Sequence, residues 1–152
     1  MTSHTNIITH PTYDEIHRAC VDMVQQVLAK GIAPTKVLGL ARGGLLPAVI
    51  ISHLLNCPMA VANYSSKSGV GDDKNHDNVL PSLNEKTILL VDDICDSGKT
   101  LAEVFQHYTL AHRGRQAVFS VVLYYKENDS FIPDFYWQKL PRDSEWIVFP
   151  FE

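Results

Sequence analysis

The sequence predicts an α/β fold in which a central parallel sheet is flanked by helices on both faces. Residues 87–91 form a short, continuous apolar run rich in branched side chains, a pattern typical of a strand buried on both faces of a parallel sheet. A short loop leads from this run into helical periodicity at residues 101–110, and residues 36–40 lead in the same way into residues 45–55. Two such strand–loop–helix units favour a sheet whose ligands bind at the carboxyl ends of its strands.

The N-terminal part predicts a loose segment followed by a helix. Residues 1–9 are expected to form a loose start or a short edge segment. Thr12 followed by Glu15 is a capping box, which predicts the start of a helix. Apolar residues then recur at helical spacing through residues 16–28, and Gly31 is expected to close the helix. We interpret this apolar stripe as core.

Two further strands are predicted, at residues 58–64 and 116–125, and a long polar segment follows the first of them. Residues 65–85 contain charges of both signs and two glycines. A long stretch of this kind inside a compact domain is typical of a lid or of a flexible connector, and the composition leaves both open.

The most informative stretch is the end of the apolar run. Asp92 and Asp93 follow it directly, and we expect these adjacent carboxylates to end the buried strand. Asp96 comes next, and the small-residue loop that follows leads into the helix. Backbone N–H groups at a helix start attract anions, above all phosphate. Carboxylates at a strand tip suit sugar hydroxyls or a hard cation such as Mg²⁺.

Three other interpretations of this stretch fit less well. Gly98-Lys99-Thr100 is similar to the end of a Walker A loop, but that motif needs a glycine where this chain has Asp93. A response-regulator receiver needs a phospho-acceptor aspartate several elements after its acidic pair, and too little sequence follows here. A plain solvated loop does not account for three carboxylates and a glycine between a buried strand and a helix.

Residues 91–100 resemble the phosphoribosyl pyrophosphate (PRPP) signature of the type I phosphoribosyltransferases. The acidic pair, the third acid three residues after the second, and the small-residue turn all match. The resemblance implies the type I phosphoribosyltransferase fold over residues 1–152. It further implies a core at residues 10–125, a lid loop at 65–85 that closes over PRPP, and a small C-terminal hood at 126–152.

The resemblance also implies roles for the two strand-end loops. The ribose hydroxyls would be held by Asp92 and Asp93, and the 5′-phosphate by Asp96, Ser97, Gly98, Lys99 and Thr100. The pyrophosphate loop would be Ala41, Arg42, Gly43 and Gly44, and in this family the peptide before the basic residue is often cis. Catalysis would depend on Asp93, on Arg42 beside the leaving pyrophosphate, and on Asp96 as the acid/base at the purine's imidazole nitrogen.

Residues 126–152 are rich in aromatic residues and proline, and they carry a second resemblance. Lys126, followed by Trp146-Ile147 and a Pro-aromatic-acid ending, resembles the bacterial xanthine-guanine phosphoribosyltransferases. The match implies that Lys126 donates to the purine's exocyclic oxygen, that Trp146 stacks on the base and that Ile147 lies nearby. Glu152 stands where that family has an aspartate involved with Mg²⁺ or the base, so the metal ligands expected are Asp93 and Glu152. Without the resemblance, Trp146 would be read as core and Lys126 as a surface residue.

These resemblances imply a purine salvage enzyme that transfers the phosphoribosyl group from PRPP to guanine, xanthine or hypoxanthine with Mg²⁺. Two alternatives stay open from the sequence. One is a phosphoribosyltransferase for uracil or adenine, and the other is a non-enzymatic regulator that senses PRPP or nucleotides. The sequence leaves open which base is preferred. Members of the family are dimers or tetramers, so we expect a homodimer or homotetramer.

Composition and charge limit the binding partners and the cellular compartment that we expect. The net charge is −4 at pH 7 and there is no basic run, which argues against nucleic-acid partners and against binding to an anionic membrane surface. No apolar stretch is long enough to span a bilayer, and we find no secretory signal. The three cysteines lack metal-binding spacing, which favours reduced thiols in the cytoplasm. Cys95 precedes a helix start, a position that can lower a thiol pKa, although we interpret it as a packing residue.

Overall fold

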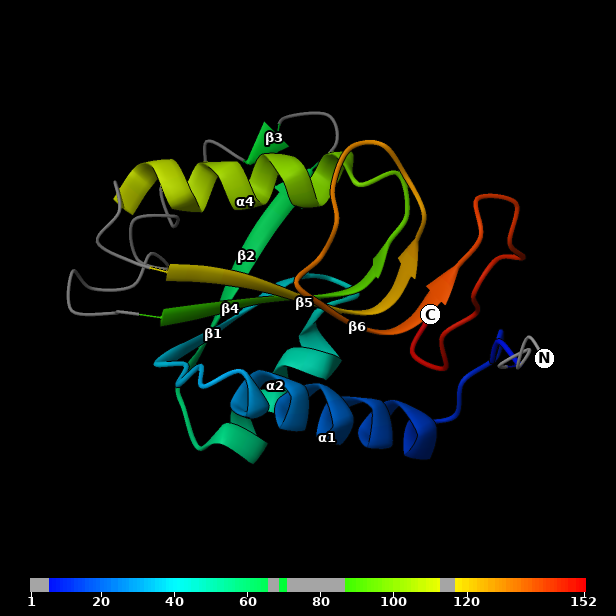
Figure 1. The fold of residues 1–152 in the computed structure, drawn as a ribbon, viewed down its shortest axis with the longest axis horizontal. Coiled ribbons are helices and arrows are strands. Elements are labelled where there is room, and N and C mark those ends of the chain that lie inside the picture. Colours follow the sequence, from blue (N-terminus) through cyan, green and yellow to red (C-terminus); the bar gives the residue numbers. More distant parts are fainter. Residues whose placement is uncertain (1–5, 66–68, 71–86, 113–116) are drawn as a thin grey trace.

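The computed structural model describes residues 6–65, 69–70, 87–112 and 117–152. Within these ranges, the strands form a single sheet in the order β3-β2-β1-β4-β5-β6, and every neighbouring pair is parallel except β2 with β3. Helices α1 and α2 cover one face of the sheet and α4 covers the other (Figure 1), which confirms the predicted architecture. The strands are β1 (Lys36–Ala41), β2 (Met59–Ser65), β3 (Gly69–Val70), β4 (Thr87–Cys95), β5 (Ala117–Lys126) and β6 (Phe135–Leu140).

The helices begin where their sequences indicate. They are α1 (Tyr13–Ala29), α2 (Leu45–Leu55) and α4 (Lys99–His112). The capping box at α1 is confirmed, because the Glu15 N–H donates to Thr12 Oγ1 at 3.1 Å and the Thr12 N–H donates to Glu15 Oε1 at 3.2 Å. Gly31 follows the helix with φ +75°, a conformation that glycine adopts without strain. Within the described part of the chain, none of the helices is long and apolar enough to cross a membrane.

The core lies in two layers, one on each face of the sheet, and β4 contributes to both. Leu89 and Val91 pack on the side of α1 and α2, whereas Ile88 and Leu90 pack on the side of α4. Successive side chains of a strand point to opposite faces, so a strand buried on both faces must be apolar at every position. This explains the continuous apolar run that the sequence shows.

The strand β4 is longer than we predicted. It continues through Asp92 and Asp93 to Cys95 instead of ending at the acidic pair. The pairing with β1 ends at Gly39 and Val91, but the pairing with β5 continues as far as Cys95 and Tyr125. Beyond Val91 the strand therefore has a partner on one side only, and partly exposed carboxylates are tolerated on this free end.

The hood adds a strand that the sequence analysis did not predict. Strand β6 extends the sheet beyond β5, from the Val121–Phe135 pair to the Lys126–Leu140 pair. The predicted lid at residues 65–85 lies outside the described residues, except for Ser65 in β2 and the short strand β3.

Residues 6–10 are bonded to the hood and to β5. The Val148 N–H donates to the Thr9 carbonyl at 2.8 Å, and the Tyr124 hydroxyl donates to the Ile8 carbonyl at 2.5 Å. The Ile8 N–H donates to Gln138 Oε1 at 3.1 Å. This part of the expected loose start is therefore held in place by hydrogen bonds, although it forms no strand.

The start of β6 is held to β5 by three hydrogen bonds between Ser120 and Asp134, which we call the polar staple. Ser120 is fully buried, and both its N–H and its hydroxyl donate to Asp134 Oδ2, at 2.7 and 3.1 Å. The Asp134 N–H in turn donates to Ser120 Oγ at 2.9 Å. These bonds help to set where β6 starts along β5.

Replacing Asp134 with Ala should destabilise the protein, because the buried Ser120 N–H and hydroxyl would lose their acceptor. We expect a loss of about 1–3 kcal/mol in the free energy of unfolding, measured by urea denaturation. Asp143→Ala, at an exposed position in the same hood, is the control and should change stability by less than about 0.5 kcal/mol. Equal effects of the two substitutions would show that the staple does not hold the hood.

Candidate active site

The predicted site residues converge because they follow neighbouring parallel strands. Residues 41–44 end β1, residues 92–100 end β4 and begin α4, and Lys126 ends β5. Since β1, β4 and β5 are adjacent in the sheet, their carboxyl ends open onto one edge. The structure thus brings together the loops that the sequence analysis assigned to pyrophosphate, ribose and 5′-phosphate.

The loop after β1 is built to approach β4 closely. The Ala41–Arg42 peptide is cis, as the resemblance implied. A Cβ on Gly44 would collide with the Val91 carbonyl oxygen, and a Cβ on Gly43 would collide with the Asp93 carboxylate. At Gly44 the obstacle is backbone, so only glycine fits there, whereas a side chain at position 43 would displace the Asp93 carboxylate. The loop backbone lies directly against the acidic pair, with the exposed Arg42 at its outer side.

The acidic pair is held by short backbone bonds. Asp92 Oδ1 accepts from the Asp93 N–H at 2.8 Å, and Asp93 Oδ1 accepts from the Ile94 N–H at 2.7 Å. Burial raises the pKa of the Asp92 carboxyl well above its ordinary value, and repulsion from Asp93 adds to this effect. Burial likewise raises the pKa of Asp93, and the charge of Glu152 acts in the same direction. Two crowded carboxylates of this kind favour a cation or hydroxyl donors.

The loop between β4 and α4 encloses a small cavity. Its volume is about 210 Å³, and it is lined by Asp92, Asp93, Ile94, Cys95, Asp96, Ser97, Gly98, Thr100 and Leu101. Gly98 has φ +80°, which turns the chain into the helix that starts at Lys99. The first N–H groups of a helix have no partner within it, so this end of α4 suits a phosphate group.

A larger cavity joins the β1 loop to the hood. Its volume is about 770 Å³, and its lining is Arg42, Gly43, Leu45, Leu46, Asp93, Trp146, Phe151 and Glu152. Trp146 is 71% exposed and therefore is not a core residue. Ile147 is 3% exposed and packs in the core beneath, so its side chain faces away from the cavity. Asp93 lines both cavities, which places them side by side.

Lys126 lies beside the loop between β4 and α4. Its Nζ is 3.4 Å from Asp96 Oδ1, and both side chains are partly open to solvent. The sequence analysis assigned these two residues to the same substrate but gave no contact between them. It also missed Asn128, whose side chain joins the start of the hood to β4. An asparagine two residues after a strand, within a polar turn, is the one signal that could have indicated it.

Cys95 is a packing residue and not an activated thiol. Its side chain is buried, and burial raises the pKa of the thiol to about 11. Its Sγ accepts from Asn128 Nδ2 at 3.6 Å and donates to the Phe131 carbonyl at 3.9 Å. Although a helix start can lower a thiol pKa, burial raises it here. The interpretation of Cys95 as a packing residue holds.

Comparison with known proteins gives the same fold and family. The family model described as phosphoribosyl transferase domain matches residues 12–152. A xanthine-guanine phosphoribosyltransferase of Cereibacter sphaeroides is 32% identical over an alignment of 152 positions, which covers 94% of this chain and 86% of that protein. A xanthine-guanine phosphoribosyltransferase of Idiomarina loihiensis is 29% identical, and the alignment covers 98% of this chain and 89% of that protein.

Solved structures agree with this result. A purine phosphoribosyltransferase from Pyrococcus horikoshii superposes with a TM-score of 0.78 and 30% identity, covering 95% of this chain and 93% of that one. The xanthine-guanine-hypoxanthine phosphoribosyltransferase of Helicobacter pylori has a TM-score of 0.78 at 24% identity, covering 94% and 92%. At that identity the likeness shows the fold alone.

Thiol reactivity tests the description of Cys95. At about pH 7.5 the Cys95 thiol is protonated and covered, so iodoacetamide should leave it unmodified in the folded protein. Cys20 is also buried, with a pKa raised to about 12 by burial, and should behave alike. Cys57 is half-buried and should be modified first. Peptide mass spectrometry of the folded and urea-unfolded protein gives the comparison. Rapid labelling of Cys95 in the folded protein would contradict the packing role.

Proposed function

The chain belongs to the phosphoribosyltransferase family, and on that premise we propose that it is a purine salvage enzyme for 6-oxopurine bases. It transfers the 5-phosphoribosyl group from PRPP to guanine, xanthine or hypoxanthine and releases pyrophosphate. The proposal includes the division into a core at residues 10–125, a lid at 65–85 and a hood at 126–152. A cytoplasmic location and a homodimeric or homotetrameric state stay predictions.

The observation that carries the choice of base is the distance of 3.4 Å between Lys126 Nζ and Asp96 Oδ1. A 6-oxopurine presents its oxygen at position 6 and its imidazole nitrogen N7 side by side on one edge. A lysine only donates hydrogen bonds, and a carboxyl group can give or take a proton. Lys126 at the oxygen and Asp96 at N7 therefore match this edge.

The same pair disfavours the other two bases. Adenine carries an amino group at position 6, which is itself a donor and offers nothing to a lysine. Uracil has no imidazole ring, so Asp96 would have no imidazole N–H from which to accept a proton. Trp146, on the wall of the larger cavity, offers a flat surface on which a purine stacks. Ile147, the next residue in the chain, is buried in the core and does not need to touch the base.

The donor set fits Mg²⁺. Among the residues that the structure describes, no group of three or more His, Cys, Asp or Glu side chains is arranged to hold a metal ion. Mg²⁺ commonly takes one or two carboxylates and completes its shell with water and substrate phosphates. Asp93 and Glu152 line one cavity, and the charge of Glu152 reaches Asp93. These two residues would hold the ion, which would neutralise charge on the pyrophosphate when bound.

The residues then divide the reaction between them. The bond from ribose C1 to the pyrophosphate oxygen breaks, and a bond from C1 to the purine nitrogen forms. Arg42 and the backbone of Gly43 and Gly44 receive the negative charge that grows on the leaving group. Asp92 and Asp93 orient the ribose hydroxyls, and the loop from Asp96 to Thr100 anchors the 5′-phosphate. Asp96 accepts the proton that N7 loses as the other imidazole nitrogen of the purine attacks C1.

A base panel tests the proposed function. Purified protein with PRPP and Mg²⁺ should form nucleotide from at least one of guanine, xanthine and hypoxanthine, and the change in absorbance follows the product. Adenine and uracil should react at least about 100-fold more slowly in kcat/KM, because each lacks one of the two matched groups. Equal rates with adenine would overturn the assignment of Lys126. No product with any 6-oxopurine would overturn the function.

Replacing Asp93 with Asn tests the assigned centre. The amide oxygen can still accept from the Ile94 N–H, so the fold should be kept, but the charge that holds the cation and the ribose is lost. We expect turnover to fall about 100-fold or more while the urea midpoint changes little. Asp143→Asn, an exposed position in the hood, is the matched control and should retain activity. Full Mg²⁺-dependent activity of Asp93→Asn would show that Asp93 does not play this part.

A further inference from the structure

We propose that Asn128 is a positioning residue that holds Lys126 and the 5′-phosphate loop, residues 96–100, in a fixed relation to each other. The inference rests on the proposed function and adds a residue to it. Asn128 is not among the lining residues of either cavity, so it acts through the groups it holds and not by touching substrate.

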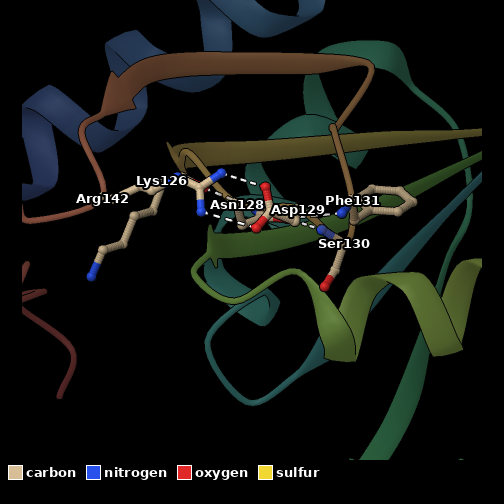
Figure 2. A network of polar contacts seen from close by, with 6 residues as sticks. All are labelled: Lys126, Asn128, Asp129, Ser130, Phe131 and Arg142. Atoms are coloured by element: carbon tan, nitrogen blue, oxygen red, sulfur yellow. Dashed lines mark hydrogen bonds and ion pairs between the residues drawn. The ribbon is translucent and has the colours of Figure 1, made fainter.

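The Asn128 amide uses its oxygen and its nitrogen in different directions. Its Oδ1 accepts from the N–H groups of Ser130 and Phe131, both at 2.8 Å. Its Nδ2 donates to the Lys126 carbonyl at 2.9 Å and to Cys95 Sγ at 3.6 Å. Two N–H donors on one side and a carbonyl on the other fix which atom is oxygen and which is nitrogen. Figure 2 shows the amide between Lys126 and the turn at residues 130–131.

The same amide lies against the 5′-phosphate loop. A Cβ on Gly98 would stand 2.5 Å from Asn128 Oδ1 and 2.9 Å from its Cγ. The Phe131 N, which the amide holds, would also stand 2.9 Å from that Cβ. Gly98 is buried and has φ +80°, so the loop turns at the point where it meets Asn128. Asn128 is thus bonded to Cys95 at the end of β4 and lies close to Gly98 in the loop that follows.

The contacts form a closed path. Asn128 holds the backbone of Lys126, the Lys126 ammonium lies 3.4 Å from Asp96, and Asp96 lies between Cys95, which is bonded to Asn128, and Gly98, which lies close to it. The two groups assigned to the purine edge and the turn assigned to the phosphate therefore share one anchor. A shift of this amide would move the groups assigned to the purine relative to those assigned to the phosphate. Such a misplacement should weaken binding of both the purine and PRPP.

The variant Asn128→Asp isolates the donor side of the amide. The carboxylate keeps the shape and still accepts from Ser130 and Phe131, but it cannot donate to Lys126 or Cys95 and faces the Lys126 carbonyl with like charge. We expect the KM for PRPP and the KM for the purine to rise together, each by about tenfold, as for the loss of one hydrogen bond to a buried group. A purely structural role would reduce the active fraction and leave both KM values unchanged.

Asp129→Asn is the matched control. It replaces a carboxylate with an amide at the next residue in the chain. That carboxylate pairs with Arg142 on the exposed side of the hood (Figure 2). Its KM values should equal those of the wild type. An active Asn128→Asp with unchanged KM values, or with only one of them raised, would overturn the inference while the function stands.

A measurement on the wild type covers the case in which Asn128→Asp does not fold. Hydrogen exchange of the peptide that covers residues 127–132 should slow when PRPP and Mg²⁺ are added, because phosphate bound at Gly98 tightens the turn that Asn128 holds. Residues 13–20 of α1, on the other face of the sheet, are the reference and should not change. Unchanged exchange at 127–132, with slower exchange at residues 96–100, would overturn the inference alone. A wild type that binds no PRPP and forms no nucleotide would overturn the proposed function and this inference together.

Discussion

The close approach of two strand ends is the constraint on which the site depends. Strands β1 and β4 are neighbours, and the loop that leaves β1 must turn without striking the end of β4. Gly43 and Gly44 make this possible, because any side chain there would meet the Asp93 carboxylate or the Val91 carbonyl. The cis peptide, the acidic pair and the start of α4 all lie around this contact. Without it, the loop of residues 41–44 and the carboxylates of Asp92 and Asp93 would belong to separate surfaces.

The same contact has an energetic cost, which the local bonding offsets in part. Carboxylates that lose water disfavour their charged form, and Asp92 and Asp93 lose water together. Each accepts a backbone N–H from the residue that follows it, and this favours the charged form. A bound sugar hydroxyl or cation would supply the rest of the compensation. The site is thus less stable empty than filled, as is common for sites built for binding.

Much of this arrangement could be predicted from the sequence, and what could not has a physical reason. The apolar run of β4, the capping box at Thr12 and the glycine turn after β1 are local signals, and each lies where it was expected. Strand β6 was missed because it is an edge strand in which most residues are only partly buried, so its apolar pattern is weak. We predicted that β4 ends at the acidic pair because its continued pairing with β5 alone depends on the tertiary structure, which the local sequence does not show. Asn128 acts on residues far away in the chain, a relation that no local pattern contains.

Hydrogen bonds between the N-terminal residues and distant parts of the chain bear on the order in which the site forms. The Tyr124 hydroxyl and the Ile8 carbonyl are separated by 116 positions in the chain, and Tyr13 and Pro150 by 137. Contacts this distant form late, since the ends of a long loop must first meet. On a ribosome, the carboxyl ends of β1 and β4 exist before the segment with Trp146 has been synthesised. A nascent chain would therefore contain both strand ends to which we assign the phosphoribosyl group before it contains the tryptophan to which we assign the base.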